Sequence, residues 1–189
     1  MYSTGNEYAV ETLEAAFQGE LNCQARYKAF AAQADHDELR GLASLFRAAA
    51  RSEQIHSVNH SRVIRHMGGE TGARPQPVQT RSTAENLQAA LSGEQLEIES
   101  LYPHYINRVA SHLDTRLVRT LTWALESEKA HARLLSDAKA LLESGKPDTW
   151  IGNARIFYVC VVCGYTSETH EADYCPICNY PWERFETIR

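Results

Sequence analysis

The sequence lacks the features of several specialised classes of protein. No apolar run approaches the roughly 20 residues that a helix needs to cross a bilayer, and the N-terminal segment has no basic start followed by an apolar stretch. There is no block of lysine and arginine, and the net charge is −5, whereas nucleic-acid binding needs a basic face for the phosphates. We therefore expect a cytoplasmic protein that binds neither membrane nor nucleic acid.

Cysteine is also scarce before residue 160, where Cys23 stands alone. The other four cysteines form two CxxC pairs near the C-terminus: Cys160, Cys163, Cys175 and Cys178. Four thiols at this spacing predict one tetrahedral metal site rather than disulfides, and both zinc and iron fit such a site. A tail of about 40 residues cannot bury a sufficient core by itself, so a bound metal would stabilise it. We expect Cys23 to be a small core residue.

Four long amphipathic segments account for most of the remaining sequence. Apolar residues recur at helical spacing over residues 4–34, about 38–67, 83 to about 112, and 115–144. Short turns join the first pair and the second pair, while residues 68–82 contain Gly and Pro without periodicity. This pattern predicts a mainly α protein with a four-helix bundle and a long crossover over residues 1–146, as in ferritin-like bundles. A small four-cysteine metal domain would follow over residues 147–189.

Charged residues occupy positions in these apolar stripes where a core would exclude them. They form a repeat in which each half of the bundle has one glutamate on its first helix and a Glu-x-x-His pair on its second. The residues are Glu20, Glu53 and His56 in the first half, and Glu94, Glu128 and His131 in the second. Residues i and i+3 share a helix face, so each pair can bind one ion. Burying four carboxylates without cations is very unfavourable, and oxygen and imidazole ligands suit iron or manganese. The set matches the ligands of di-iron carboxylate bundles.

Three further residues lie on the same helix faces as this repeat. Glu97 follows the second-half glutamate by three residues, and the corresponding position in the first half is Cys23. We expect Glu97 to be a fifth carboxylate that lets one iron change ligands with oxidation state. Tyr27 and Tyr102 lie two turns beyond the first glutamate of each half, where their hydroxyls can bond to ligating carboxylates. The remaining histidines, His60 among them, lack the repeat relation and are expected to be surface or packing residues.

Together these motifs resemble the rubrerythrin family over nearly the entire chain and in the same domain order. The segment SGEQLEIESLYPHY is similar to the family's third-helix signature, and VCVVCGY and YCPICNYP are similar to rubredoxin knuckles. The resemblance implies a ferritin-like di-iron bundle followed by a rubredoxin-like domain with one iron on four cysteines. It also implies a division of ligands between the two irons of the bundle: Glu20 with His56 or Glu97 for the first, Glu94 with His131 for the second, and Glu53 and Glu128 as bridges.

The same resemblance implies a peroxidase that reduces hydrogen peroxide to water in defence against oxidative stress. Glu97, Tyr27 and Tyr102 would be its catalytic residues beside the ligands. Electrons would pass through the four-cysteine iron from rubredoxin or an NADH-linked reductase. A head-to-tail homodimer would place this iron near the di-iron site of the partner subunit.

Two other functions remain open from the sequence. A ferritin-like iron oxidase that uses oxygen would employ the same bundle ligands. An adaptor protein with a C-terminal zinc ribbon would leave the carboxylates in the apolar stripes unexplained.

Overall fold

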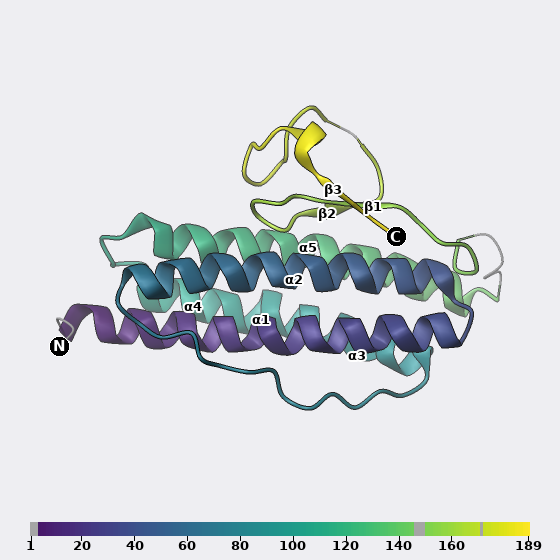
Figure 1. Ribbon diagram of the computed structural model, residues 1–189, viewed down its shortest axis with the longest axis horizontal. Coiled ribbons are helices and arrows are strands. Elements are labelled where there is room, and N and C mark those ends of the chain that lie inside the picture. Colours follow the sequence, from purple (N-terminus) through teal and green to yellow (C-terminus); the bar gives the residue numbers. More distant parts are fainter. Residues whose placement is uncertain (1–3, 146–149, 171) are drawn as a thin grey trace.

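The computed structural model describes residues 4–145, 150–170 and 172–189, and it is a four-helix bundle with a small module on one face (Figure 1). The first pair of helices is α1 (Thr4–His36) and α2 (Arg40–His66). The second pair is α5 (Thr115–Glu143) and a long helix made of α3 (Thr83–Leu96), η1 (Glu97–Leu101) and α4 (Tyr102–Val109). The crossover between the pairs runs along the α1 side, opposite the module, as Figure 1 shows. The predicted mainly α, ferritin-like architecture is confirmed.

Side-chain caps explain where the second pair of helices begins. Ser82 and Glu85 form a reciprocal capping box at the start of α3, which satisfies two backbone N–H groups that have no partner within the helix. Asp114 accepts a hydrogen bond from the backbone N–H of Arg116 at 3.0 Å and caps α5.

The third helix of the bundle contains a π-helical turn that the sequence pattern alone did not predict. The Tyr102 N–H bonds to the carbonyl of Glu97, five residues earlier, so this turn holds one residue more than an α-helical turn. The repeat explains why: Glu20 and Tyr27 are seven residues apart, but Glu94 and Tyr102 are eight apart. An uninterrupted α-helix would rotate Tyr102 by about 100°. The π turn absorbs the extra residue.

Two apolar clusters hold the bundle together, one toward each end. Leu42, Phe46 and Leu135 belong to one cluster, and Leu13 and Leu121 belong to the other. Each fully buried side chain of this kind stabilises the fold by about 1.5–3 kcal/mol relative to its exposed state. The polar repeat lies between the two clusters, so the core on both sides can support a site that is unfavourable by itself.

The C-terminal module is a three-stranded antiparallel sheet in the order β2-β1-β3, built from β1 (Phe157–Val159), β2 (Thr166–Ser167) and β3 (Glu186–Ile188). A short 3-10 turn, η2 (Trp182–Arg184), precedes the last strand. The module lies across α2 and α5 (Figure 1). The predicted domain boundary between residues 146 and 147 lies outside the described residues. None of the helices in the described part of the chain has the length and apolar character needed to cross a membrane.

Several contacts attach this module to α2. Gly41, near the start of α2, donates its N–H to the carbonyl of Ile151 at 2.7 Å, and a side chain at Gly41 would collide with the backbone that passes over it. Arg51 forms a two-point ion pair with Glu186 of β3, with N–O distances of 2.5 and 2.8 Å. Asn59 donates to the carbonyl of Val162 at 2.7 Å. The segment from residue 151 onward therefore follows α2 toward the middle of the bundle.

Candidate metal centres

The six residues of the polar repeat meet in the middle of the bundle, and each is at most 3% exposed. Their ligand atoms form two groups, each with all of its atoms within 4.8 Å of one another. The first group is Glu20, Glu53, His56 and Glu128, and the second is Glu53, Glu94, Glu128 and His131. Glu53 and Glu128 belong to both groups. The arrangement has places for two ions, with these two carboxylates between them.

Unsatisfied polar atoms show that the cluster fits a cation. Among the described residues, carboxylate oxygens of Glu20, Glu53, Glu94 and Glu128 are buried without a hydrogen-bond partner. His131 Nδ1 lies 2.7 Å from Glu128 Oε2 but lacks hydrogen-bond geometry. Leaving one such group unsatisfied costs about 1–3 kcal/mol, and more when it is charged. Metal ions would satisfy these atoms together.

The pKa shifts of the cluster residues also result from the burial of several carboxylates close together. Burial, and then the charge of Glu128, raise the pKa of Glu94 to about 7. Burial disfavours the charged form of His131, but the nearby carboxylates of Glu128 and Glu94 outweigh it and raise the pKa of His131 to about 10. Without metal, protons on the histidines balance the carboxylates. Bound cations would replace those protons.

The two tyrosines connect the halves of the repeat crosswise. The Tyr27 hydroxyl donates to Glu94, and the Tyr102 hydroxyl donates to Glu20. Glu20 and Glu94 are thus each held by a tyrosine from the other half. Burial, and then the charges of the nearby carboxylates, raise the pKa of both phenols well above its usual value. Both tyrosines therefore remain protonated donors that orient the glutamates.

Glu97 lies beside this cluster but belongs to neither ligand group among the described residues. It opens the π turn η1, and its Oε1 accepts a hydrogen bond from the Cys23 thiol at 3.1 Å. Arg26 donates to the same sulfur at 3.0 Å. Burial, followed by the charge of Glu94, raises the pKa of Glu97 well above its usual value. The expected role of Glu97 as an additional ligand stays a prediction.

His60 is a member of the site that the sequence reasoning underestimated. It is fully buried, its Nδ1 lies 3.0 Å from the Thr120 hydroxyl, and its Nε2 lies 3.3 Å from the Tyr102 hydroxyl. His60 follows His56 by four residues, so it lies on the same helix face. This spacing alone could have placed His60 near the site, but His60 has no equivalent in the other half of the repeat and was therefore not included.

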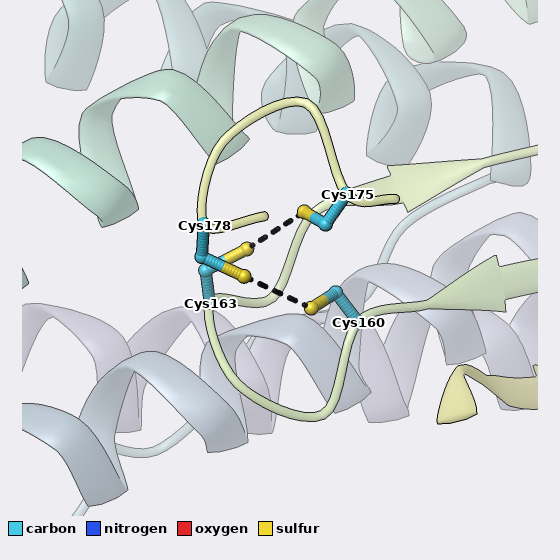
Figure 2. A group of neighbouring side chains, drawn as sticks. All are labelled: Cys160, Cys163, Cys175 and Cys178. Carbon is cyan, nitrogen blue, oxygen red and sulfur yellow. Dashed lines mark hydrogen bonds between the residues drawn. The ribbon is translucent and has the colours of Figure 1, made fainter. Parts of the chain in front are cut away.

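The four cysteines converge where the two CxxC turns face each other (Figure 2). Cys160 and Cys178 have sulfurs 3.5 Å apart, and those of Cys163 and Cys175 are 3.4 Å apart. Both distances far exceed the roughly 2.05 Å of a disulfide and suit four thiolates around one ion. The geometry is that of a single mononuclear metal site.

The residue after each CxxC turn has a left-handed backbone conformation. Gly164 has φ of 87° and Asn179 has φ of 58°. Their backbone N–H groups bond to the carbonyls of Cys160 and Cys175 at 2.9 and 3.0 Å, which closes each turn. Glycine and asparagine are the residues that adopt this conformation at least cost.

Backbone groups of the first cysteine turn join the two centres directly. His56 presents Nδ1 to the carboxylates, while its Nε2 lies 3.1 Å from the carbonyl of Cys163. Ser52 donates to the carbonyl of Gly164 at 2.7 Å. A Cβ atom at Gly164 would lie 2.6 Å from the Ser52 hydroxyl and even closer to the His56 ring. One imidazole thus separates the four-cysteine cluster from the carboxylate cluster.

The fold and the two clusters define a class: a ferritin-like di-iron carboxylate protein with an attached four-cysteine iron module. The rubrerythrin family model matches residues 11–139. The chain belongs to the rubrerythrin family. Its cofactors are a di-iron centre and one mononuclear iron on four cysteines.

Individual relatives agree with this assignment. Rubrerythrin-2 of Clostridium acetobutylicum is 31% identical over 98% of this chain and 100% of its own length. A structure of fully reduced, all-ferrous nigerythrin matches with a TM-score of 0.85 and 28% identity, covering 95% of this chain and 86% of that one. A bacterioferritin of Desulfovibrio desulfuricans matches with a TM-score of 0.68 and 20% identity over 80% of this chain and 93% of its own. This last likeness concerns the bundle fold alone.

Proposed function

We propose that the protein is a peroxidase that reduces hydrogen peroxide to two molecules of water with two electrons and two protons. The observation that carries the proposal is a cavity of about 20 Å³ next to the carboxylate cluster. Its lining includes Glu20, Glu97, Tyr102 and Tyr105. A space of this size holds about one water molecule. It therefore favours a very small substrate over a bulky organic one.

The two carboxyl groups that line the cavity favour peroxide over oxygen. Hydrogen peroxide has two O–H donors, and the carboxylates of Glu20 and Glu97 can accept from them. Molecular oxygen has no donor and gains nothing from these groups. Residues around the cavity also hold protons where the reaction needs them: burial raises the pKa of Glu97, so this carboxyl can deliver a proton to a departing oxygen. Tyr102 keeps Glu20 in place throughout.

The di-iron centre, when bound, supplies the two electrons that break the O–O bond. We infer a ligand set from the two groups above: Glu20 and His56 at one iron, Glu94 and His131 at the other, and Glu53 and Glu128 between them. Nδ1 of each histidine faces the carboxylates. The module holds the opposite edge of each ring, since His131 Nε2 lies 3.3 Å from the Thr166 hydroxyl and His56 Nε2 contacts Cys163. Such support fixes the orientation of a ligating imidazole.

The four-cysteine iron would return the electrons one at a time. The contact between the Cys163 carbonyl and the His56 ring, 3.1 Å long, would connect the two centres. An external donor, either rubredoxin or an NADH-linked reductase, would reduce this iron at the exposed side of the module. The head-to-tail homodimer expected from the family resemblance stays a prediction. Within this single chain, the module lies on its own bundle (Figure 1).

The first experiment compares anaerobically reduced protein mixed with one equivalent of peroxide or of oxygen. Visible absorption follows the oxidation of both iron sites. We expect the di-iron site to be oxidised much faster by peroxide; faster oxidation by oxygen would favour the iron oxidase instead. Glu97→Ala should slow peroxide reduction, and unchanged turnover would remove the assigned role of Glu97.

A second variant tests the electron route. Cys160→Ser removes one ligand of the four-cysteine site and should abolish steady-state turnover with the external reductase. The single oxidation of a chemically reduced di-iron site by peroxide should remain. Normal steady-state turnover by Cys160→Ser would refute the route through the module.

A further inference from the structure

The side chain of Glu97 is turned toward α1, and two residues of α1 hold it there. Its Oε1 accepts the hydrogen bond from the Cys23 thiol at 3.1 Å, and Arg26 donates to the Cys23 sulfur at 3.0 Å. The thiol therefore lies between a guanidinium and a carboxylate.

The repeat explains why a thiol occupies this place. Cys23 follows Glu20 by three residues, as Glu97 follows Glu94, and the two equivalent positions meet each other as residues on a two-fold axis do. Glutamates at both positions would put two carboxylates in contact and raise the energy of the ionised pair. A thiol at one of them gives the other a neutral hydrogen-bond donor.

The backbone at Glu97 also differs from an ordinary helix. Glu97 is the first residue of the π turn, and its carbonyl accepts a hydrogen bond from the Tyr102 N–H, five residues on. Such single π turns occur frequently at functional sites. The cavity of about 20 Å³ lies beside the same residue, so the Glu97 side chain borders open space on the side of the ligand groups.

The geometry points to Cys23 as the positioning residue of Glu97: its thiol holds the carboxylate against α1, and loss of this hydrogen bond lets Glu97 join the ligands of the nearer ion. Cys23 thereby sets how often Glu97 is a ligand. This inference deepens the proposed role of Glu97 and rests on it, but it does not depend on peroxide as the substrate.

The test measures binding of Co²⁺ to protein whose four-cysteine site has been filled with Zn²⁺. The visible bands of Co²⁺ report both its affinity and its coordination number. Cys23→Ala and Cys23→Val lack the donor, so Glu97 is released and the bundle should bind Co²⁺ about tenfold more tightly, which corresponds to about 1.4 kcal/mol. Their bands should also weaken as the coordination number rises. Cys23→Ser keeps a donor and should resemble the unchanged protein.

Controls separate this role from packing. In a Glu97→Gln background, Cys23→Ala should leave Co²⁺ binding unchanged, because the carboxylate that the thiol holds is absent. Cys23→Val leaves no cavity and no hydrogen-bond donor, and it carries the test if Cys23→Ala fails to fold, as judged by helical content. Equal effects of Cys23→Ala and Cys23→Ser, or Co²⁺ binding unchanged in Cys23→Val, would overturn the inference. Since no peroxide is used, failure of the peroxidase proposal would appear separately in turnover.

Discussion

Gly164 lies against His56 and Ser52, where the four-cysteine module meets the carboxylate cluster, and Gly164→Ala tests that junction. An alanine at φ of 87° is strained, and its Cβ would lie 2.6 Å from the Ser52 hydroxyl and closer still to His56. Neither neighbour has room to move, since both are buried. We expect the first cysteine turn to move away from α2.

The magnitude follows from two contributions. A left-handed conformation costs an ordinary L-residue about 1–2 kcal/mol. Separation of the turn from α2 would also remove the bonds from Ser52 to the Gly164 carbonyl and from His56 to the Cys163 carbonyl, at about 0.5–1.5 kcal/mol each. The attachment of the module should therefore weaken by about 2–5 kcal/mol.

The assay is denaturant unfolding of iron-loaded protein, with visible absorption for the four-cysteine iron and helical circular dichroism for the bundle. In Gly164→Ala the visible signal should be lost before the helical signal, and electron transfer from the module to the di-iron site should slow. Gly145→Ala is the matched control, because Gly145 has φ of 66° but open space around its Cα. Equal effects of the two substitutions would refute the steric argument and show that backbone strain accounts for the whole effect.

Three further predictions concern the metals and the bundle. Glu128→Gln should prevent loading of both irons in the bundle but retain the four-cysteine iron, as measured by elemental analysis, and it should destabilise the metal-free bundle because His56 and His131 lose the carboxylate that balances their charge. Removal of the four-cysteine iron with a chelator should increase hydrogen exchange in the module far more than in the helices. The hydrogen bond from Thr83 lowers the pKa of Asp37 from 3.8 to about 2, so its stabilisation is complete above the unfolded-state pKa and is lost as pH falls from about 4 to 2. Asp37→Asn should remove this pH dependence of stability, as thermal unfolding between pH 2 and 5 would show. The free energy of unfolding that is lost should be about 1 kcal/mol or less, because the carboxylate is largely exposed.

The carboxylate cluster could be predicted from sequence because its chemistry is local. In each Glu-x-x-His pair, helical spacing alone puts both side chains on one face. The repeat then relates Glu53 to Glu128 and His56 to His131, so identifying one pair identifies the other. The two cysteine turns are equally local. To bring the Glu-x-x-His pairs together, the four helices only had to pack around a common axis. The long crossover in the sequence indicated that arrangement.

Contacts between the halves were harder to predict because they depend on helix order and rotation. The crosswise bonds from Tyr27 and Tyr102 require α1 and the third helix to lie opposite each other. The π turn had a signal in the extra residue between Glu94 and Tyr102, but spacing does not say where a helix will absorb it. The contact of Cys23 with Glu97 depends on that turn and was not predicted.

The attachment of the module also had no sequence signal, and it bears on the predicted head-to-tail dimer. Arg51 on α2 and Glu186 on β3 form a two-point ion pair within one chain. A dimer that exchanged modules would form the same pair between chains. The contacts themselves are identical in the two cases, so a substitution experiment must distinguish the chain of origin.

Reversing each charge separately provides that distinction. Arg51→Glu and Glu186→Arg each place like charges at the junction, and the double variant restores an opposite pair. If modules are exchanged, co-expression of the two single variants should enrich the mixed dimer well above half, because one junction then has the original pair and the other the reversed pair. If each module stays on its own bundle, every chain keeps a mismatch whatever its partner, and any dimers should mix statistically. Native mass spectrometry of differently tagged chains measures the ratio. The head-to-tail dimer predicts a clear excess of mixed dimer, with each cysteine iron next to the partner's di-iron site; statistical mixing would show that each module stays on its own bundle.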